Sequence, residues 1–143
     1  MKAAILIDGA YFVKRYRALY PEKRDDPIQT TVRNLYSGAI NLLRKANRPP
    51  RYRELYRIFF YDCPPLEKYV QNPISKQGVK LSQSDEAQFR NALHNELKKQ
   101  RKVALRLGRL DDSNAQWTLK EGLLKKLLQG KINIADSDNK RNF

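Results

Sequence analysis

The chain begins with a short apolar run that ends at an acid: residues 3–7 have the sequence Ala-Ala-Ile-Leu-Ile, and Asp8 and Gly9 follow. Short runs of branched aliphatic residues bounded by turn residues are typical of buried parallel strands. In open α/β sheets, ligands bind beyond the carboxyl ends of the strands, and Asp8 would lie there. A carboxylate on a rigid support suits a hard divalent cation. The alternative is that Asp8 caps the turn or helix that follows.

A second run has the same organisation. Residues 56–61 are rich in aromatic and β-branched side chains, and the run ends at Asp62. Pro64 and Pro65 follow, which forbid continuation of the strand. Because parallel strands end at the same edge of their sheet, we expect Asp8 and Asp62 to lie at one edge.

Segments with helical periodicity separate the predicted strands. Apolar residues recur on one face between residues 30 and 46, and again between residues 85 and 101. This alternation predicts βαβ units and a mostly parallel sheet. We expect strands at residues 3–7, 57–61 and 103–107, with the first in the middle. The helices should cover the sheet on opposite faces or as successive crossovers.

The other segments give weaker predictions. Residues 66–83 are polar and predict a long loop with little regular structure. Residues 118–121, Thr-Leu-Lys-Glu, match a capping box, which Trp117 would staple to the core. The helix that follows would end at Gly130 and carry a narrow leucine stripe, formed by Leu119, Leu123, Leu124, Leu127 and Leu128.

The chain is strongly basic. It has 29 Lys and Arg against 15 Asp and Glu, a formal net charge of +14. Such an excess favours polyanionic partners. The chain has a single cysteine, Cys63, so an intramolecular disulfide is excluded, which suits the reducing cytoplasm. Its single histidine, His94, is expected on a polar helix face at the surface. The N-terminal region has no apolar segment long enough for export or membrane insertion, so no membrane partner is expected.

Three blocks together resemble the NYN domains of the PIN-like nuclease superfamily, in particular the LabA-like branch: residues 5–12, 61–65 and 105–110. The resemblance implies an α/β fold with a three-layer, PIN-like (Rossmann-like) parallel sheet flanked by helices. It implies that residues 1–143 form a single domain that lacks the last strands of the family. It also implies clustered acids that hold Mg²⁺ or Mn²⁺ for hydrolysis of RNA.

Asp8 matches the first-strand acid of that family, and Asp62 matches a supporting position close to the site. Both are therefore candidate catalytic and metal-binding residues. The family's two later acidic blocks are not found. Asp136 and Asp138 imitate the last of them in letters, but the missing glycine and the thin apolar run before them favour a solvated loop over metal ligands.

Basic and aromatic residues follow Asp8 directly. Lys14, Arg15 and Arg17 would lie near the acid-bearing edge, where a phosphate backbone could pass, and Tyr11 could stack on unpaired bases. We predict that these four residues contact RNA or another single-stranded nucleic acid. The basic run over residues 98–102 is expected to be a solvated helix end. For the run over residues 44–53, nucleic-acid binding and a solvated face both stay open.

Two functions from different classes follow. The first is a metal-dependent endoribonuclease acting on RNA, or the N-terminal part of one. The alternative is a catalytically inactive module that binds nucleic acid or protein. In either case a second copy of the chain, or a missing C-terminal portion, is expected to cover the leucine stripe.

Overall fold

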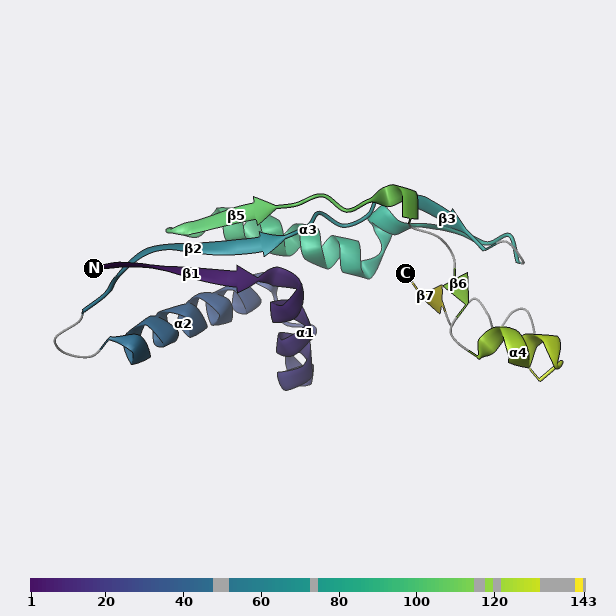
Figure 1. Cartoon of the computed structure of the whole chain (residues 1–143), viewed down its shortest axis with the longest axis horizontal. Coiled ribbons are helices and arrows are strands. Elements are labelled where there is room, and N and C mark those ends of the chain that lie inside the picture. The colour runs from purple at the N-terminus through teal and green to yellow at the C-terminus, as the bar shows by residue number, and fades with distance from the viewer. Residues whose placement is uncertain (48–51, 73–74, 115–117, 120–121, 132–140, 143) are drawn as a thin grey trace. The chain divides into compact units, whose positions relative to one another are not determined.

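The computed structural model describes most of the chain: residues 1–47, 52–72, 75–114, 118–119, 122–131 and 141–142 (Figure 1). These residues fall into two compact units, each made of two segments of the chain. The first unit comprises Met1–Pro64 and Gln88–Arg109, and the second comprises Pro65–Ala87 and Leu110–Phe143. The first unit holds the sheet and both candidate acids.

The sheet of the first unit has three parallel strands in the order β1 (Lys2–Asp8), β2 (Glu54–Asp62) and β5 (Val103–Leu107). This confirms the predicted α/β class, a parallel sheet flanked by helices that is consistent with a Rossmann-like fold. The expectation that the first strand lies in the middle was wrong, because β2 is the central strand. The burial agrees, because Ile58 and Phe60 of β2 are fully buried, whereas Ile5 and Ile7, their register partners in β1, are only partly buried.

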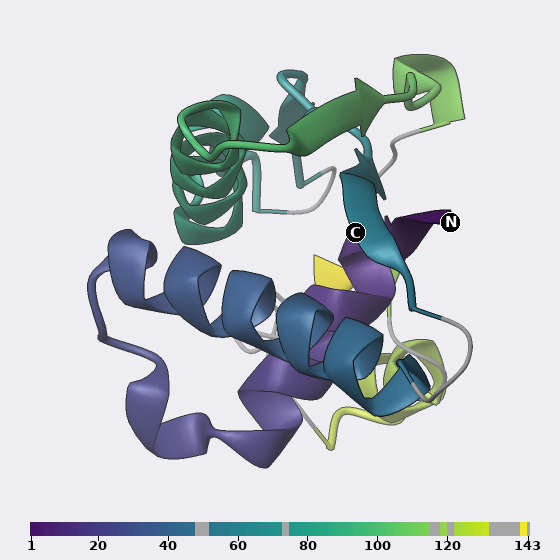
Figure 2. The ribbon, with the colours of Figure 1, turned by 90° about the vertical axis from the view of Figure 1, so that its left-hand side faces the viewer.

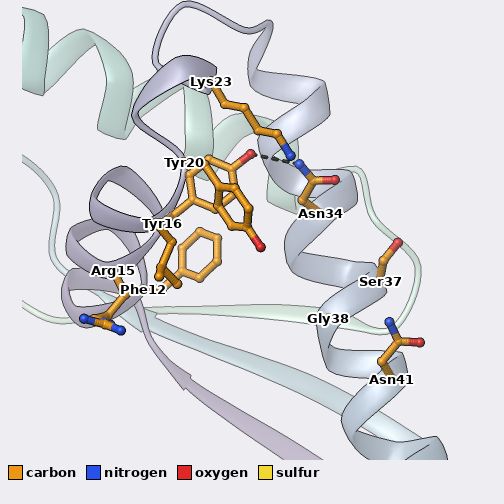
Figure 3. A pocket seen from close by; sticks show the side chains of 10 residues that line it. Phe12, Arg15, Tyr16, Tyr20, Lys23, Asn34, Ser37, Gly38 and Asn41 are labelled. Atoms are coloured by element: carbon orange, nitrogen blue, oxygen red, sulfur yellow. Dashed lines mark hydrogen bonds between the residues drawn. The ribbon is translucent and has the colours of Figure 1, made fainter.

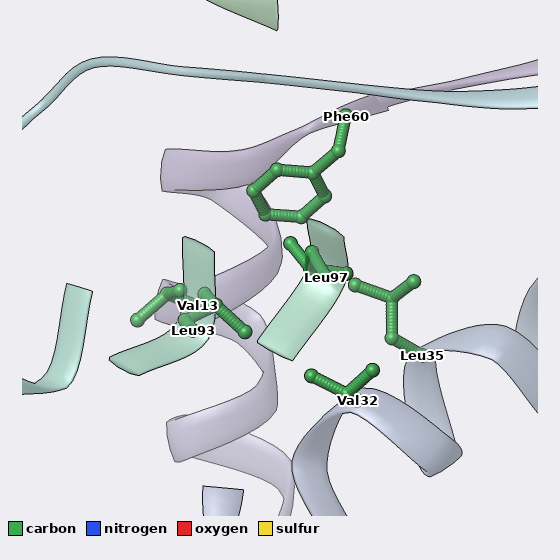
Figure 4. Close-up of a cluster of buried hydrophobic side chains, with 6 residues drawn as sticks. All are labelled: Val13, Val32, Leu35, Phe60, Leu93 and Leu97. Atoms are coloured by element: carbon green, nitrogen blue, oxygen red, sulfur yellow. The ribbon is translucent and has the colours of Figure 1, made fainter. Parts of the chain in front are cut away.

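Three helices pack on the sheet of the first unit: α1 (Gly9–Leu19), α2 (Ile28–Ala46) and α3 (Asp85–Lys98). Figure 4 shows side chains from all three around Phe60, in a buried cluster completed by Val13, Val32, Leu35, Leu93 and Leu97. The helices therefore form successive crossovers on one face, as Figure 2 also shows for α2 and α3. The chain steps across the sheet in one direction, and right-handed crossovers then place their helices on the same side.

Gly9 allows α1 to begin directly against β2. A Cβ atom at this position would lie 2.6 Å from a ring carbon of Phe60 and 2.8 Å from the carbonyl oxygen of Tyr61. Only a residue without a side chain fits this approach. The glycine after Asp8 thus fixes how closely the first helix follows the acid.

The second unit contains short elements. Strands β3 (Tyr69–Gln71) and β4 (Gly78–Lys80) form an antiparallel hairpin, so the expectation of little regular structure over residues 66–83 was wrong. The hairpin is anchored by Asn72, which is fully buried and whose backbone N–H donates to the carbonyl of Gln77 at 2.8 Å. Three-residue strands are too short to give a visible alternation in the sequence.

The remaining elements of the second unit are η2 (Leu81–Gln83), η3 (Asp112–Asn114), α4 (Leu123–Leu128), and an antiparallel pair of β6 (Thr118–Leu119) with β7 (Arg141–Asn142). Thr118 thus lies in a strand and does not start the helix. Gly130, with φ of +70°, follows the C-cap as predicted. Trp117, Asp136 and Asp138 lie outside the described residues, as do the side chains of Leu119 and Leu123. Among the helices described, none is long and apolar enough to cross a membrane.

Candidate functional site

The two predicted acids end neighbouring strands. Asp8 is the last residue of β1, Asp62 is the last residue of β2, and the strand register pairs Asp8 with Tyr61. Both acids therefore lie at the carboxyl edge of the sheet, which is the expected edge for a ligand site in this class of fold. Their side chains have different surroundings.

Asp8 is the N-cap of α1. Its Oδ1 atom accepts a hydrogen bond from the backbone N–H of Tyr11 at 2.9 Å, and the side chain is exposed. Such a bond satisfies one of the donors that the first turn of a helix leaves unpaired. The capping role, which the sequence left as an alternative, is thus present. Because the residue faces solvent, capping leaves the carboxylate accessible.

Asp62 is held in a buried ion pair. Its side chain is only 6% exposed. The Arg90 guanidinium donates from one nitrogen to both carboxylate oxygens, at 2.9 and 2.7 Å, and the Nε2 atom of His94 lies 2.8 Å from Oδ2. Arg90 and His94 are four residues apart in α3 and so share one helix face. This cluster ties the carboxyl end of β2 to the middle of α3.

His94 was expected at the surface, and this was wrong: it is 4% exposed. Burial is possible because Asp62 supplies the hydrogen bond that a buried imidazole needs. The sequence carries a partial signal, because Arg90 and His94 have helical i, i+4 spacing beside the buried Leu93. Nothing in the sequence states that their common partner is Asp62, twenty-eight residues before Arg90.

Opposing effects act on the pKa of Asp62. Burial by itself raises this pKa, but hydrogen bonds from His94, Arg90 and the Cys63 backbone, together with the charge of Arg90, lower it below the ordinary value of 3.8. The carboxylate is therefore ionised at neutral pH in the folded protein. Because the folded pKa is the lower one, ionisation of Asp62 favours the folded state above the pKa of the unfolded chain.

We expect this contribution to be lost in acid. As the pH drops below about 4, Asp62 is protonated in the unfolded chain before it is protonated in the folded protein. The free energy of unfolding should therefore fall over this range. Urea denaturation of the wild type and of Asp62→Asn, compared between about pH 7 and about pH 3, measures the effect. The wild type should lose more stability than the variant over this interval. Identical acid dependence of the two proteins would contradict the assignment.

The residues predicted to contact nucleic acid divide into two groups. Tyr11, Lys14 and Arg15 are exposed and share one face of α1, with Tyr11 63% exposed. Arg17 differs, because its guanidinium carbon lies 4.6 Å from the centroid of the Phe89 ring of α3. That stacking holds α1 and α3 together. The first three residues thus form one surface that begins directly after Asp8.

A complete metal site is not visible in the described part of the chain, where no group of three or more His, Cys, Asp or Glu side chains could hold an ion. Both oxygens of Asp62 are already bound by Arg90, and one also by His94. A cation at Asp62 would have to displace or repel the guanidinium. Among the predicted ligands with described side chains, Asp8 is the one whose carboxylate faces solvent.

The chain was compared with protein-family models, with curated proteins and with solved structures. No family model matches it, and neither does any curated protein or solved structure. The likeness to NYN domains therefore stays a prediction from the three sequence blocks. The parallel sheet agrees with that prediction, but parallel α/β sheets host many unrelated functions.

Proposed function

We propose that this chain is an NYN or PIN-like domain that binds RNA at the carboxyl edge of its sheet and cleaves it with Mg²⁺ or Mn²⁺. The observation that carries the proposal is the exposed carboxylate of Asp8, which ends β1 and is followed at once by the surface of Tyr11, Lys14 and Arg15. A metal-binding acid beside a basic and aromatic helix face is the arrangement that phosphodiester chemistry needs.

Each of these residues has a separate role in the proposal. Asp8 would bind the metal ion through the carboxylate oxygen that does not cap α1. Lys14 and Arg15 would hold phosphate groups, and Tyr11 would stack on an unpaired base, which favours single-stranded RNA. The bound ion supplies activation of water and stabilisation of the charge that develops on the phosphate.

Asp62 has a different role in this proposal from that first assigned to it. Its ion pair with Arg90 and His94 supports a positioning role, in which β2 and α3 keep the edge of the sheet rigid beside Asp8. One carboxylate holds a divalent ion weakly, so further acids are required. Acids of a second copy of the chain are candidates.

Binding alone should follow from the charge of the protein. With a net charge of +14, the chain releases counterions from a polyanion, and its affinity for RNA should fall steeply as salt concentration rises. The proposal places this activity in the cytoplasm, because a reducing compartment suits a chain whose single cysteine forms no intramolecular disulfide. It also includes a second copy as a partner for α4, whose Leu124 and Leu128 are 53% and 79% exposed.

Replacing Asp8 with asparagine tests the catalytic part. Asparagine caps helices about as well as aspartate, so the fold should be preserved. Cleavage of single-stranded RNA in Mg²⁺ or Mn²⁺ should fall by about 100-fold or more, because a metal-binding charge is lost. RNA binding measured in chelator should stay close to that of the wild type. Asp25→Asn, at an exposed acid outside the site, is the matched control. Unchanged cleavage by Asp8→Asn would remove Asp8 from the mechanism.

The second candidate function is a nucleic-acid-binding module without catalytic activity. The observation in its favour is that the carboxylate of Asp62 is already bound by Arg90 and His94. Few carboxylates of the described residues are therefore available to coordinate a metal ion. The same assay separates the two functions. Salt-sensitive RNA binding with no metal-dependent cleavage by the wild type would establish the binding module.

A further inference from the structure

A cavity of about 360 Å³ lies in the first unit between α1 and α2, and η1 (Pro21–Lys23) contributes to its rim (Figure 3). Its volume lies in the range of about 300–1,000 Å³ that is typical of small-molecule sites. Of the residues that line it, the proposed RNA-cleaving function uses only Arg15.

One wall of the cavity is aromatic. Phe12 and Tyr16 of α1 and the C-cap residue Tyr20 follow one another on the side toward α2, with ring centroids 5.5 Å apart for the first pair and 5.3 Å for the second. Tyr16 is fixed by a hydrogen bond of 2.8 Å that its hydroxyl accepts from the amide of Asn34, and Tyr20 is 41% exposed. A wall of ordered rings that remains partly open favours a planar ligand.

The lining of the cavity includes basic side chains and no acidic ones. Arg15 and Lys23 line it, and the Lys23 ammonium lies 4.4 Å from the centroid of the Tyr20 ring. All residues that line the cavity are described, and none of them is acidic. The opposite wall adds the hydroxyl of Ser37 and the amide of Asn41 as hydrogen-bonding groups. Positive charge beside an aromatic wall is complementary to a ligand that joins a flat ring to an anionic group.

We propose that this cavity binds one nucleotide, with the base against the aromatic wall and the phosphate near Lys23. The nucleotide is either free or part of an RNA strand. In the second case the inference rests on the proposed function, and Arg15 connects the two sites, because it also belongs to the exposed surface with Tyr11 and Lys14.

Gly38 gives a direct way to close the cavity. It lies in α2 and lines the cavity, and a Cβ atom built on it meets no other atom within 4 Å. Gly38→Leu should therefore fill the space without a clash. Leucine also has a higher helix propensity than glycine, so the thermal midpoint should not fall below that of the wild type. Gln29→Leu, which adds the same side chain to an exposed position of α2 outside the cavity, is the matched control.

Tyr20→Ala removes the exposed ring of the wall, and Tyr52→Ala removes a ring that is 66% exposed elsewhere in the same unit. Adenosine and uridine monophosphates, inorganic phosphate and a short oligouridylate are titrated into the full chain in chelator. Gly38→Leu and Tyr20→Ala should each weaken binding of the nucleotide by about tenfold or more, as loss of base stacking does. The two controls should bind as the wild type does.

The titrations distinguish the source of the nucleotide. Weakened binding of the monophosphates identifies a site for free nucleotides, whereas weakening confined to the oligouridylate identifies a nucleotide within a strand. Unchanged binding of every nucleotide probe in Gly38→Leu would overturn the proposal. Inorganic phosphate that competes as well as the monophosphates would also overturn it, because the base would then contribute nothing.

This inference and the proposed cleavage can fail separately. Asp8→Asn lies outside the cavity, so its nucleotide binding reports on the cavity alone, while its RNA cleavage in metal reports on the edge of the sheet. In the wild type, nucleotide binding without metal-dependent cleavage supports the cavity site and opposes the proposed function. Cleavage by the wild type with no nucleotide bound in the cavity supports the proposed function and opposes the cavity site.

Discussion

Replacing Asp62 with alanine is expected to lower the free energy of unfolding by about 3–5 kcal/mol at neutral pH, as removal of one partner from a buried ion pair does. The variant leaves the Arg90 guanidinium and the His94 imidazole without the carboxylate that both contact. The side chains of Arg90 and His94 are only 16% and 5% exposed, so water replaces that partner poorly. Denaturation in urea at constant pH measures the loss.

Two further variants define the origin of the effect. Asp62→Asn keeps the shape and an acceptor oxygen, so its loss of stability should be smaller than that of alanine. Asp8→Ala removes an acid from the same edge of the sheet, but it breaks only a helix cap and should cost about 0.5–2 kcal/mol. Equal losses for Asp62→Ala and Asp8→Ala would show that the buried cluster contributes no more than an exposed cap.

Phe60→Ala is expected to destabilise the first unit by about 3–5 kcal/mol, which is the usual cost of truncating a buried phenylalanine. Phe60 is fully buried on the central strand, and its ring makes an edge contact with Phe12 at 6.3 Å between centroids. The cavity left behind would border side chains from α1, α2 and α3 (Figure 4). Because Phe60 joins all three helices, thermal denaturation should show a lower midpoint for the unit as a whole.

The adjacent residue provides the control for this prediction. Tyr61 is 47% exposed and points to the other face of β2, so Tyr61→Ala should change the free energy of unfolding by only about 0.5 kcal/mol. If the two variants were equally stable, the buried cluster around Phe60 would not be the core of this unit.

The carboxyl edge of the sheet was largely predictable. The apolar runs before Asp8 and Asp62 are local patterns, and local patterns determine where a strand ends. The alternation of strands with helices then predicts a parallel sheet with both acids at one edge, as found. The order of the strands was not predictable in the same way. It depends on which strand pairs with a neighbour on both of its edges, and no local pattern in the sequence identifies β2 as that strand.

The sequence by itself determined the two acids, their common edge, the basic face of α1 and the positions of α2 and α3, because each follows from residue type and periodicity along a continuous segment. Tertiary structure alone decided that Asp62 pairs with Arg90 and His94, and that Phe12, Tyr16 and Tyr20 line a cavity against α2. These arrangements join residues far apart in the chain. Their partners are chosen by packing between elements, and no local pattern encodes that packing.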